Sequence, residues 1–433
     1  MFLKATKDVR EHTNSYYAAT INNPSNYPSL EGEITTDVCV IGGGFSGVNT
    51  ALELAERGFS VVLLEANRIG WGATGRNGGQ IIGGIGHKLQ QFKRRIGDDG
   101  IKTIQQAGWE CCEIIRERVA KYHIDCDLSW GYADVAIKPR HIDELKAFQA
   151  EQQAAGYPYK LEWVEAEQMR EHHVNSKSYL GALVNKDGYG HVHPLNLCRG
   201  EAAAAASLGT QIFEQSKVVR VIEGDKPRVI TENGAVTAKF VVHCGNAYMG
   251  DLQPKLAKKI LPATSCVIAT EPLGDLAKDI MPGNLAVCDP NTALDYFRLS
   301  ADGRLLFGGL SNYTGLEPKN LIGTMQAKML KVFPELASST VDFGWSGNMG
   351  IGINRMPQLG RLSHNVFYIQ AYSGHGVAPT HLTARVTADM IAQQAERFDV
   401  FAKIHHWNWP GGKLLRRPGM ALGMLWFKLL DEL

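Results

Sequence analysis

Apolar residues near the start of the chain follow a strand–helix–strand order. Val38–Ile41 and Val61–Leu64 are short continuous apolar runs, whereas residues 45–57 place apolar side chains three or four positions apart. Continuous runs are typical of strands buried on both faces of a parallel sheet, and the second spacing is typical of a helix with one buried face. The pattern therefore predicts a β-α-β unit and an α/β fold.

Short apolar runs recur much later in the chain. Val218–Ile222 and Phe240–Cys244 are two further predicted strands, and residues 365–371 are a third, followed by a helix to about Ala395. We expect these segments to return to the first sheet. The predicted nucleotide-binding half is thus discontinuous in sequence.

The turn between the first strand and the first helix carries a GxGxxG pattern. Gly42 suits the tight turn, Gly44 permits close approach of backbone N–H groups to a pyrophosphate, and Gly47 permits close packing of helix on strand. Glu65 ends the second strand, where its carboxylate can accept hydrogen bonds from ribose hydroxyls and would repel a 2′-phosphate. The unit is therefore predicted to bind a dinucleotide other than NADP.

The segment after Glu65 distinguishes FAD from NAD. Residues 68–80 are dense in glycine and small side chains, which lets the backbone run against a large flat ring system. The alternative is an ordinary flexible glycine-rich loop. A second GxGxxG followed by a strand-end acid is absent from the sequence, which disfavours an NAD(P)H-dependent reductase.

Together these motifs resemble the D-amino-acid-oxidase/sarcosine-oxidase superfamily of FAD enzymes and, within it, the γ-glutamylputrescine oxidases. The resemblance extends over nearly the whole chain. The segments that carry it are GxGxxG at 42–47, Glu65, GATGRNGGQ at 72–80, SYY at 15–17, GHVHPLNL at 190–197, GNAY at 245–248, DYFRL at 295–299, RMPQ at 355–358 and YSGHGV at 372–377.

The resemblance implies an FAD that is held without a covalent bond. Residues 345–350 contain no cysteine, where covalently flavinylated sarcosine oxidases carry their attachment residue. It also implies that the helix after Val377 directs its positive N-terminus at the flavin pyrimidine ring. The expected cofactor-binding residues are Gly42, Gly44, Phe45, Ser46, Gly47, Glu65, Ala66, Arg68, Gly72, Ala73, Thr74, Asn77, Gly78, Gly79, Gln80, Val218, Gly245, Asn246, Gly374, His375, Gly376, Val377 and Thr380.

The expected architecture is a Rossmann-type FAD-binding domain interleaved with an α+β substrate domain on a mainly antiparallel sheet. The length of 433 residues exceeds that of one ordinary core. The expected ranges are 34–90, 191–254 and 361–400 for the FAD-binding domain, 91–190 and 255–360 for the substrate domain, and 401–433 for a C-terminal extension.

Candidate substrate-binding residues come from a predicted hairpin, 296–299 and 304–309 around the turn 301–303. Alternation places Tyr296 and Arg298 on one face, where they would meet the substrate or, alternatively, water. Arg355 matches the position at which amino-acid oxidases of the superfamily bind a carboxylate, with a structural ion pair as the alternative. His375 and Tyr296 are the candidate catalytic residues, although His375 need not act as a base.

Composition narrows the partners and the location. The 45 basic and 44 acidic residues give a net charge of +1, with no footprint for nucleic acid or an anionic membrane. The charged N-terminus does not resemble a signal peptide, and the apolar stretch 418–430 is too short to span a bilayer, so a cytoplasmic location is expected. That stretch is expected to pack on the protein or a second subunit, or else to attach to a membrane surface.

Metal ligation is not expected. The eight cysteines form no CxxC pair, and His191 and His193 have no further ligands nearby in sequence, so we expect these two histidines to lie between the domains. The sequence predicts no particular oligomeric state.

The resemblance implies flavin-dependent oxidative deamination of an amine. The carbon that bears the amine would lose a hydride to FAD, and hydrolysis of the resulting imine would release an aldehyde and ammonia. Oxygen would then reoxidise the flavin and yield hydrogen peroxide. The expected substrate is γ-glutamylputrescine, in putrescine catabolism. The alternatives are oxidation of another amine or amino acid and a dehydrogenase with a different acceptor, because Leu305–Gly309 lacks the oxygen-activating lysine of sarcosine oxidases.

Overall fold

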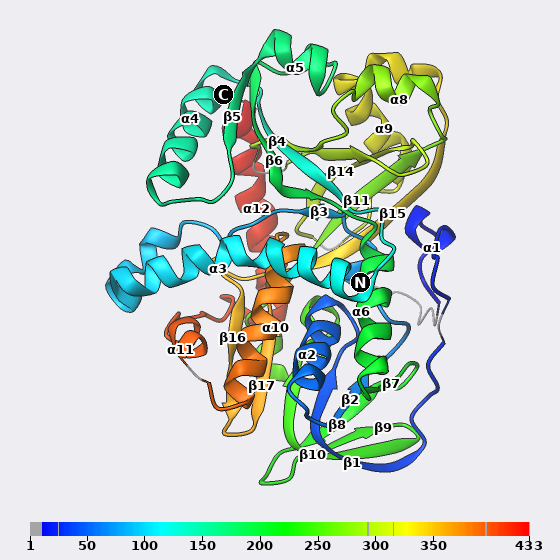
Figure 1. Ribbon diagram of the computed structural model, residues 1–433, viewed down its shortest axis with the longest axis vertical. Helices are drawn as coiled ribbons and strands as arrows, with labels where there is room; N and C mark the ends of the chain where they lie inside the picture. Colours follow the sequence, from blue (N-terminus) through cyan, green and yellow to red (C-terminus); the bar gives the residue numbers. More distant parts are fainter. Residues whose placement is uncertain (1–10, 25, 292–293, 315, 395, 433) are drawn as a thin grey trace.

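Two sheets lie end to end along the long axis of the molecule, with a long helix crossing between them (Figure 1). The computed structural model describes residues 11–24, 26–291, 294–314, 316–394 and 396–432. Strands β1, β2 and β10 lie in the lower half of Figure 1, and β4, β6 and β14 in the upper half. The α/β fold with two sheets agrees with the expected architecture.

The lower sheet has the order β16-β17-β10-β1-β2-β7, and its strands from β17 to β7 pair in parallel. Both predicted strands of the β-α-β unit belong to it, as do the later runs at 218–222, 240–244 and 365–371. A β8–β9 meander is added antiparallel to β10. The bounds are β1 Gly32–Ile41, β2 Val61–Leu64, β7 Gln211–Phe213, β8 Val218–Ile222, β9 Arg228–Thr231, β10 Gly234–His243, β16 Gln358–Ser363 and β17 Val366–Gln370.

Helices cover one face of the lower sheet and form one packed group (Figure 1). These are α2 (Phe45–Glu56), α3 (Lys93–Tyr122), α6 (Pro194–Ser207) and α10 (Val377–Ile391). The helix predicted over 45–57 is confirmed. The one predicted to about Ala395 ends at Ile391.

The upper sheet has the order β15-β11-β14-β13-β12-β4-β6-β3, with β5 added beside β6. All its pairs are antiparallel except β4 with β12, so the expectation of a mainly antiparallel sheet is confirmed. The predicted hairpin is present as β13 and β14. The bounds are β3 Gln80–Ile81, β4 Ser129–Ala136, β5 Leu161–Glu165, β6 Gly181–His191, β11 Leu261–Thr270, β12 Ala286–Cys288, β13 Tyr296–Leu299, β14 Leu305–Asn312 and β15 Val341–Ile351.

The expected domain ranges remain a prediction, and two elements cross them. Strand β3 lies in the range 34–90 but pairs in the upper sheet, whereas α3 lies in 91–190 but packs on α10 and α6 of the lower half. The remaining helices are α1 Tyr16–Ala19, α4 Pro139–Ala154, α5 Ala166–His172, α7 Pro254–Ala257, α8 Asp275–Ile280, α9 Leu321–Val332, α11 Glu396–Ala402 and α12 Gly412–Glu432.

Helix α12 contains the apolar stretch noted near the C-terminus. Met420 and Met424 pack with Leu261 and Ala263 of β11, and Arg416 donates hydrogen bonds to two backbone carbonyls before that strand. Within the described residues, none of the helices combines the length and apolar character that crossing a membrane requires.

A buried ion network joins the helices on the lower sheet. The Glu53 carboxylate on α2 is 2% exposed and pairs with Arg118 of α3 at 2.5 Å, with Arg385 of α10 at 2.9 Å, and with Arg57 at 2.5 Å. Burial opposes ionisation of Glu53, but Arg118 and Arg385 overcome it, so the pKa of Glu53 is lowered. One carboxylate therefore links three helices electrostatically.

We expect Glu53→Gln to lower the free energy of unfolding by about 3–5 kcal/mol, because it leaves buried arginines without their counter-charge. The control is Glu144→Gln, an exposed position on α4, where a change within about 0.5 kcal/mol is expected. Urea unfolding followed by circular dichroism measures both. Because the folded pKa of Glu53 is lowered, its contribution is present above the unfolded-state pKa and is lost as pH falls through the folded value. Equal effects of the two variants would contradict this role.

Candidate functional site

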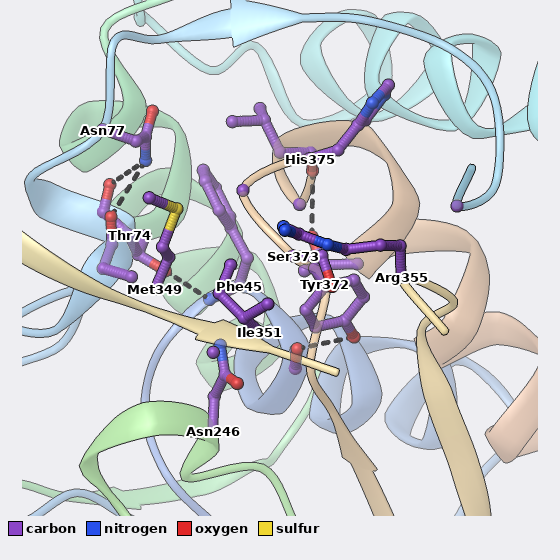
Figure 2. Close-up of a pocket in the computed structure, with 18 of the residues that line it drawn as sticks. Phe45, Thr74, Asn77, Asn246, Met349, Ile351, Arg355, Tyr372, Ser373 and His375 are labelled. Atoms are coloured by element: carbon purple, nitrogen blue, oxygen red, sulfur yellow. Dashed lines mark hydrogen bonds between the residues drawn. The ribbon is translucent and has the colours of Figure 1, made fainter. Parts of the chain in front are cut away.

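A single cavity of about 1740 Å³ runs from the strand ends of the lower sheet to the face of the upper sheet. Ordinary ligand pockets occupy roughly 300–1,000 Å³, so this one has room for a dinucleotide together with a substrate. Figure 2 shows part of its wall, with Phe45, Thr74 and Asn77 on one side and Arg355, Ser373 and His375 on the other.

The turn before α2 is built on backbone contacts that only glycine allows. Gly42 has φ of +112°, and a Cβ atom there would lie 3.0 Å from the Cys244 carbonyl carbon. A Cβ atom on Gly47 would lie 1.8 Å from the Gly42 carbonyl oxygen. Gly47 therefore seats the helix and does not line the cavity, whereas Gly42 and Gly44 do line it.

Glu65 is held at the end of β2 by two backbone donors. The Gly43 N–H donates to its Oε2 at 2.6 Å and the Asn67 N–H to its Oε1 at 2.9 Å. Burial raises the pKa of Glu65, and these N–H donors oppose the rise. The carboxylate lines the cavity beside the glycine turn, where a dinucleotide ribose would need an acceptor.

The glycine-rich segment 72–80 folds onto this turn. Thr74 Oγ1 accepts a hydrogen bond from the Phe45 N–H at 2.9 Å, and Asn77 Nδ2 donates to the Ala73 and Thr74 carbonyls at 3.1 and 2.7 Å (Figure 2). A Cβ atom on Gly78 would lie 2.3 Å from Tyr296 Cε2. The segment thus connects the nucleotide turn to an aromatic side chain of the upper sheet.

The start of α10 is strained and well anchored. Ala371, Ser373 and Gly374 have φ of 62°, 57° and 91°, values that non-glycine residues rarely adopt and that cluster at functional sites. Tyr372 anchors the loop, because its hydroxyl lies 2.9 Å from Ser46 Oγ and 2.8 Å from Thr383 Oγ1.

His375 lies between that loop and the cavity. Its Nε2 is 3.0 Å from the Ile82 carbonyl oxygen, which assigns the proton to Nε2. Burial lowers the pKa of His375, so the ring is neutral at pH 7. A neutral ring that donates a hydrogen bond to a backbone carbonyl is suited to hold the loop in place and to contact a ligand.

The cavity fits the expected FAD. His243, at the end of β10, is 1% exposed, lines the cavity and has no hydrogen-bond partner at either ring nitrogen in the described structure. Apolar residues Ile41, Leu64, Val218 and Leu252 line the same end. The buried imidazole of His243 needs a hydrogen-bond partner, and the apolar walls around it favour a flat aromatic ligand. The aromatic base of a dinucleotide meets both requirements, because it carries its own hydrogen-bonding groups. The glycine turn, the N-terminus of α2 and Glu65 suit a pyrophosphate and a ribose.

Most of the predicted cofactor-binding residues line this one cavity. They are Gly42, Gly44, Phe45, Ser46, Glu65, Ala66, Gly72, Ala73, Thr74, Asn77, Gly78, Gln80, Val218, Gly245, Asn246, Gly374, His375, Gly376, Val377 and Thr380, and Tyr296 and Arg355 join them. Gly47, Arg68 and Gly79 lie outside the lining. Arg68 instead pairs with Glu11 at 2.8 Å and Glu214 at 2.9 Å, so its predicted contact with the cofactor is not supported by this geometry.

The sequence leaves two alternatives for Arg298, a substrate-binding residue in the cavity or a charge exposed to water. The structure supports neither alternative. Arg298 is 2% exposed, and its guanidinium donates to the Gly78 carbonyl at 2.8 Å, the Val192 carbonyl at 2.8 Å and the Tyr17 hydroxyl at 3.2 Å. Tyr296 shares its face but reaches the cavity. Segments from elsewhere in the chain cover Arg298, and alternation along one strand cannot reveal them.

Arg355 remains available to a ligand. It has φ of 57°, and its guanidinium donates to the Tyr313 hydroxyl at 3.3 Å. Across the described ranges it forms no ion pair with a carboxylate. The structural ion pair considered from the sequence is therefore not observed there.

The wall that the upper sheet contributes to the cavity has no signal in the sequence. Tyr132 and Asp134 of β4, Tyr189 of β6 and Trp109 of α3 line the cavity. They belong to no motif, and only the tertiary pairing of strands brings them to the site. The two histidines between the domains have structural contacts, since His193 caps α6 through the Asn196 N–H and His191 Nε2 lies 3.1 Å from the Asn284 carbonyl.

Comparisons with known proteins agree with this geometry. The family model for FAD dependent oxidoreductases matches residues 37–390. The chain is 43% identical to the γ-glutamylputrescine oxidoreductase of Escherichia coli K12, over 98% of this chain and 100% of that protein, and 39% identical to a probable oxidoreductase, OrdL, of Haemophilus influenzae over 98% of both.

Solved structures share the fold. Glycine oxidase from Geobacillus kaustophilus matches with a TM-score of 0.71 at 20% identity, covering 87% of this chain and all of that one. L-proline dehydrogenase from P. horikoshii matches with a TM-score of 0.70 at 21% identity, covering 86% of this chain and 98% of that one.

We expect Gly47→Ala to weaken FAD retention and lower the melting temperature, because its new methyl group would meet the rigid Gly42 carbonyl and cost about 1–3 kcal/mol. The matched control is Gly423→Ala on α12, where a Cβ atom meets nothing within 4 Å. The ratio of absorbance at 450 nm to that at 280 nm in the purified proteins reports FAD content. Full flavin content and an unchanged melting temperature in Gly47→Ala would rule out this packing constraint.

Proposed function

The chain belongs to the FAD-dependent oxidoreductase family, and on that premise we propose that it oxidises the primary amine of γ-glutamylputrescine. The observation that carries the proposal is the 43% identity to the Escherichia coli enzyme of that name over the full length of both proteins. The cavity supports it, because the volume continues past the nucleotide turn to the upper sheet and leaves room for an elongated substrate.

The proposed reaction removes two electrons and two protons from the carbon–nitrogen bond of the amine. Bound FAD supplies the two-electron acceptor. The imine that forms is hydrolysed to an aldehyde and ammonia, and oxygen takes up the electrons and two protons as hydrogen peroxide.

The residues around the cavity exclude water and orient the amine. Tyr296 packs against Gly78, and burial raises the pKa of its phenol, so its hydroxyl stays protonated and serves as a hydrogen-bonding wall. Tyr132 and Tyr189 extend the aromatic wall, with ring centroids 5.7 Å apart. His375 is neutral and is proposed to hold the loop beside the reacting carbon. An obligatory general base is not required if the amine binds in its neutral form.

Arg355 is the proposed partner of the substrate carboxylate. It lines the cavity, and its guanidinium contacts the hydroxyl and the ring of Tyr313. A guanidinium without an opposing carboxylate suits bidentate recognition of that group. The glutamyl end of the proposed substrate carries one carboxylate.

A second electron acceptor is the alternative to oxygen. Residues Leu305–Gly309 of β14 contain no lysine. Sarcosine oxidases, which the sequence resembles, use a lysine to activate oxygen. A dehydrogenase that passes electrons to a carrier would fit this sequence too. Air reoxidation separates the two candidates.

Anaerobic stopped-flow mixing with γ-glutamylputrescine, putrescine and sarcosine in separate experiments tests the proposed substrate. We expect flavin absorbance near 450 nm to bleach fastest with γ-glutamylputrescine and to recover rapidly when air is admitted, with peroxide formed. Bleaching followed by slow recovery in air would favour the dehydrogenase. Bleaching with none of the three amines would exclude the proposed substrate while leaving the family assignment intact.

We also expect Arg355→Gln to lower kcat/KM for γ-glutamylputrescine by about 10- to 100-fold, mainly through KM, because a charge-assisted hydrogen bond contributes about 1.5–3 kcal/mol. The matched substrate is γ-aminobutyrylputrescine, which lacks only the carboxylate and should be oxidised equally by both proteins. If the variant lost activity equally on both amines, Arg355 would have a structural role instead.

A further inference from the structure

One row of residues runs straight across the upper sheet along the cavity. Asp134 of β4 is the register partner of Cys288 in β12, Cys288 is the partner of Tyr296 in β13, and Tyr296 is the partner of Gly308 in β14. Neighbouring strands lie about 4.8 Å apart, so the backbones of Asp134 and Tyr296 are about 10 Å apart. Asp134, Cys288 and Tyr296 all line the cavity.

Tyr296 places one end of this row at the cofactor segment. Its ring packs on Gly308, where a Cβ atom would lie 2.2 Å from the ring, and on Gly78 of the glycine-rich segment. Because residues 72–74 and 76–78 line the cavity next to the nucleotide turn, the reacting carbon of a substrate would lie near Tyr296. Asp134 then lies at the far end, two strands away.

Asp134 has a donor that orients it but lacks a counter-ion. The Tyr132 hydroxyl donates to its Oδ1 at 2.7 Å, and among the described residues it has no ion pair with lysine, arginine or histidine. Burial raises the pKa of Asp134 to about 6, which leaves it mostly ionised at pH 7. A partly desolvated carboxylate without a counter-charge is energetically costly, and a cationic ligand would offset that cost.

A second carboxylate nearby differs in this respect. Asp289 follows β12 and also lines the cavity, but its Oδ1 accepts a hydrogen bond from the Asn291 N–H at 2.9 Å, and Lys328 lies close enough to oppose the rise in its pKa. Asp289 therefore stabilises the turn that follows β12. Glu151 of α4 also lines the cavity but is exposed to water, and Glu65 is held at the glycine turn by backbone donors. Asp134 is the partly buried carboxylate on the wall of the upper sheet that a ligand can reach without competing with a protein cation in the described structure.

We propose that Asp134 binds the α-ammonium group of the γ-glutamyl end of the substrate and so selects amines that carry a second positive charge. This inference rests on the proposed function. From the reacting carbon of γ-glutamylputrescine to the α-carbon is about eight bonds, and an extended chain advances about 3.3–3.6 Å per three bonds, which gives about 9 Å. The row from Tyr296 to Asp134 has a similar length of about 10 Å. Asp134 and Arg355 come from different elements, and both line the cavity.

The test compares two substrates and three proteins. Glutarylputrescine has the shape of γ-glutamylputrescine and lacks only the α-ammonium group. The proteins are the wild type, Asp134→Asn, which keeps an acceptor for Tyr132, and Asp143→Asn, an exposed carboxylate on α4 outside the cavity lining. Anaerobic flavin reduction and steady-state KM and kcat are measured for each pair, and flavin content and melting temperature verify folding.

We expect the wild type and Asp143→Asn to prefer γ-glutamylputrescine by about 10- to 100-fold in kcat/KM, mostly through KM, as expected for a charge-assisted hydrogen bond. Asp134→Asn should lose this preference and oxidise glutarylputrescine as the wild type does. Equal losses on both substrates, or an unchanged preference, would overturn the inference. If the wild type reduces its flavin with glutarylputrescine and γ-glutamylputrescine equally, Asp134 is not a specificity residue although the amine oxidation stands. If neither amine reduces the wild-type flavin, the proposed function itself fails and takes this inference with it.

Discussion

The close approach of backbone to backbone at the turn between β1 and α2 is the constraint on which the rest of the site depends. The Gly42 carbonyl lies where a side chain on Gly47 would be, and the Cys244 carbonyl lies where a side chain on Gly42 would be. These contacts set α2 against the ends of β1 and β10. The Phe45 N–H then meets Thr74, and the Gly43 N–H meets Glu65, so the nucleotide turn, the glycine-rich segment and the strand-end acid are positioned by one another.

The two sheets are joined by polar contacts that originate in the same segment. Arg298 of the upper sheet donates to the Gly78 carbonyl, and Trp345 Nε1 donates to the Arg76 carbonyl at 3.0 Å. Backbone carbonyls inside a protein need donors, and here side chains from two strands of the upper sheet provide them. The cofactor-binding segment and the substrate-facing sheet are therefore connected directly by hydrogen bonds.

Local sequence predicted the elements that local forces determine. The β-α-β unit, the helix after Gly376 and the β13–β14 hairpin all follow from apolar periodicity and from glycine at turns, and the motif residues 42–46, 72–74 and 76–78 meet at one cavity. What could not be predicted depends on pairing between distant segments. Arg298 shares the face of Tyr296, as alternation along the strand predicts. However, residues 17, 78 and 192, which cover Arg298, come from three other parts of the chain. Asp134 became visible only through the parallel register of β4 with β12.

The burial of Arg298 has a consequence for how this protein family can change its substrate over evolutionary time. The Arg298 guanidinium donates to the carbonyls of Gly78, Val192 and Leu299, two of which are distant in sequence, so a substitution of Arg298 would leave three acceptors without this donor at once. On β4, by contrast, Asp134 accepts a hydrogen bond from Tyr132 of the same strand, so a substitution of Asp134 affects one neighbouring donor and not several distant carbonyls. New substrate preferences should therefore arise at the distal wall, while the region next to the reacting bond stays unchanged.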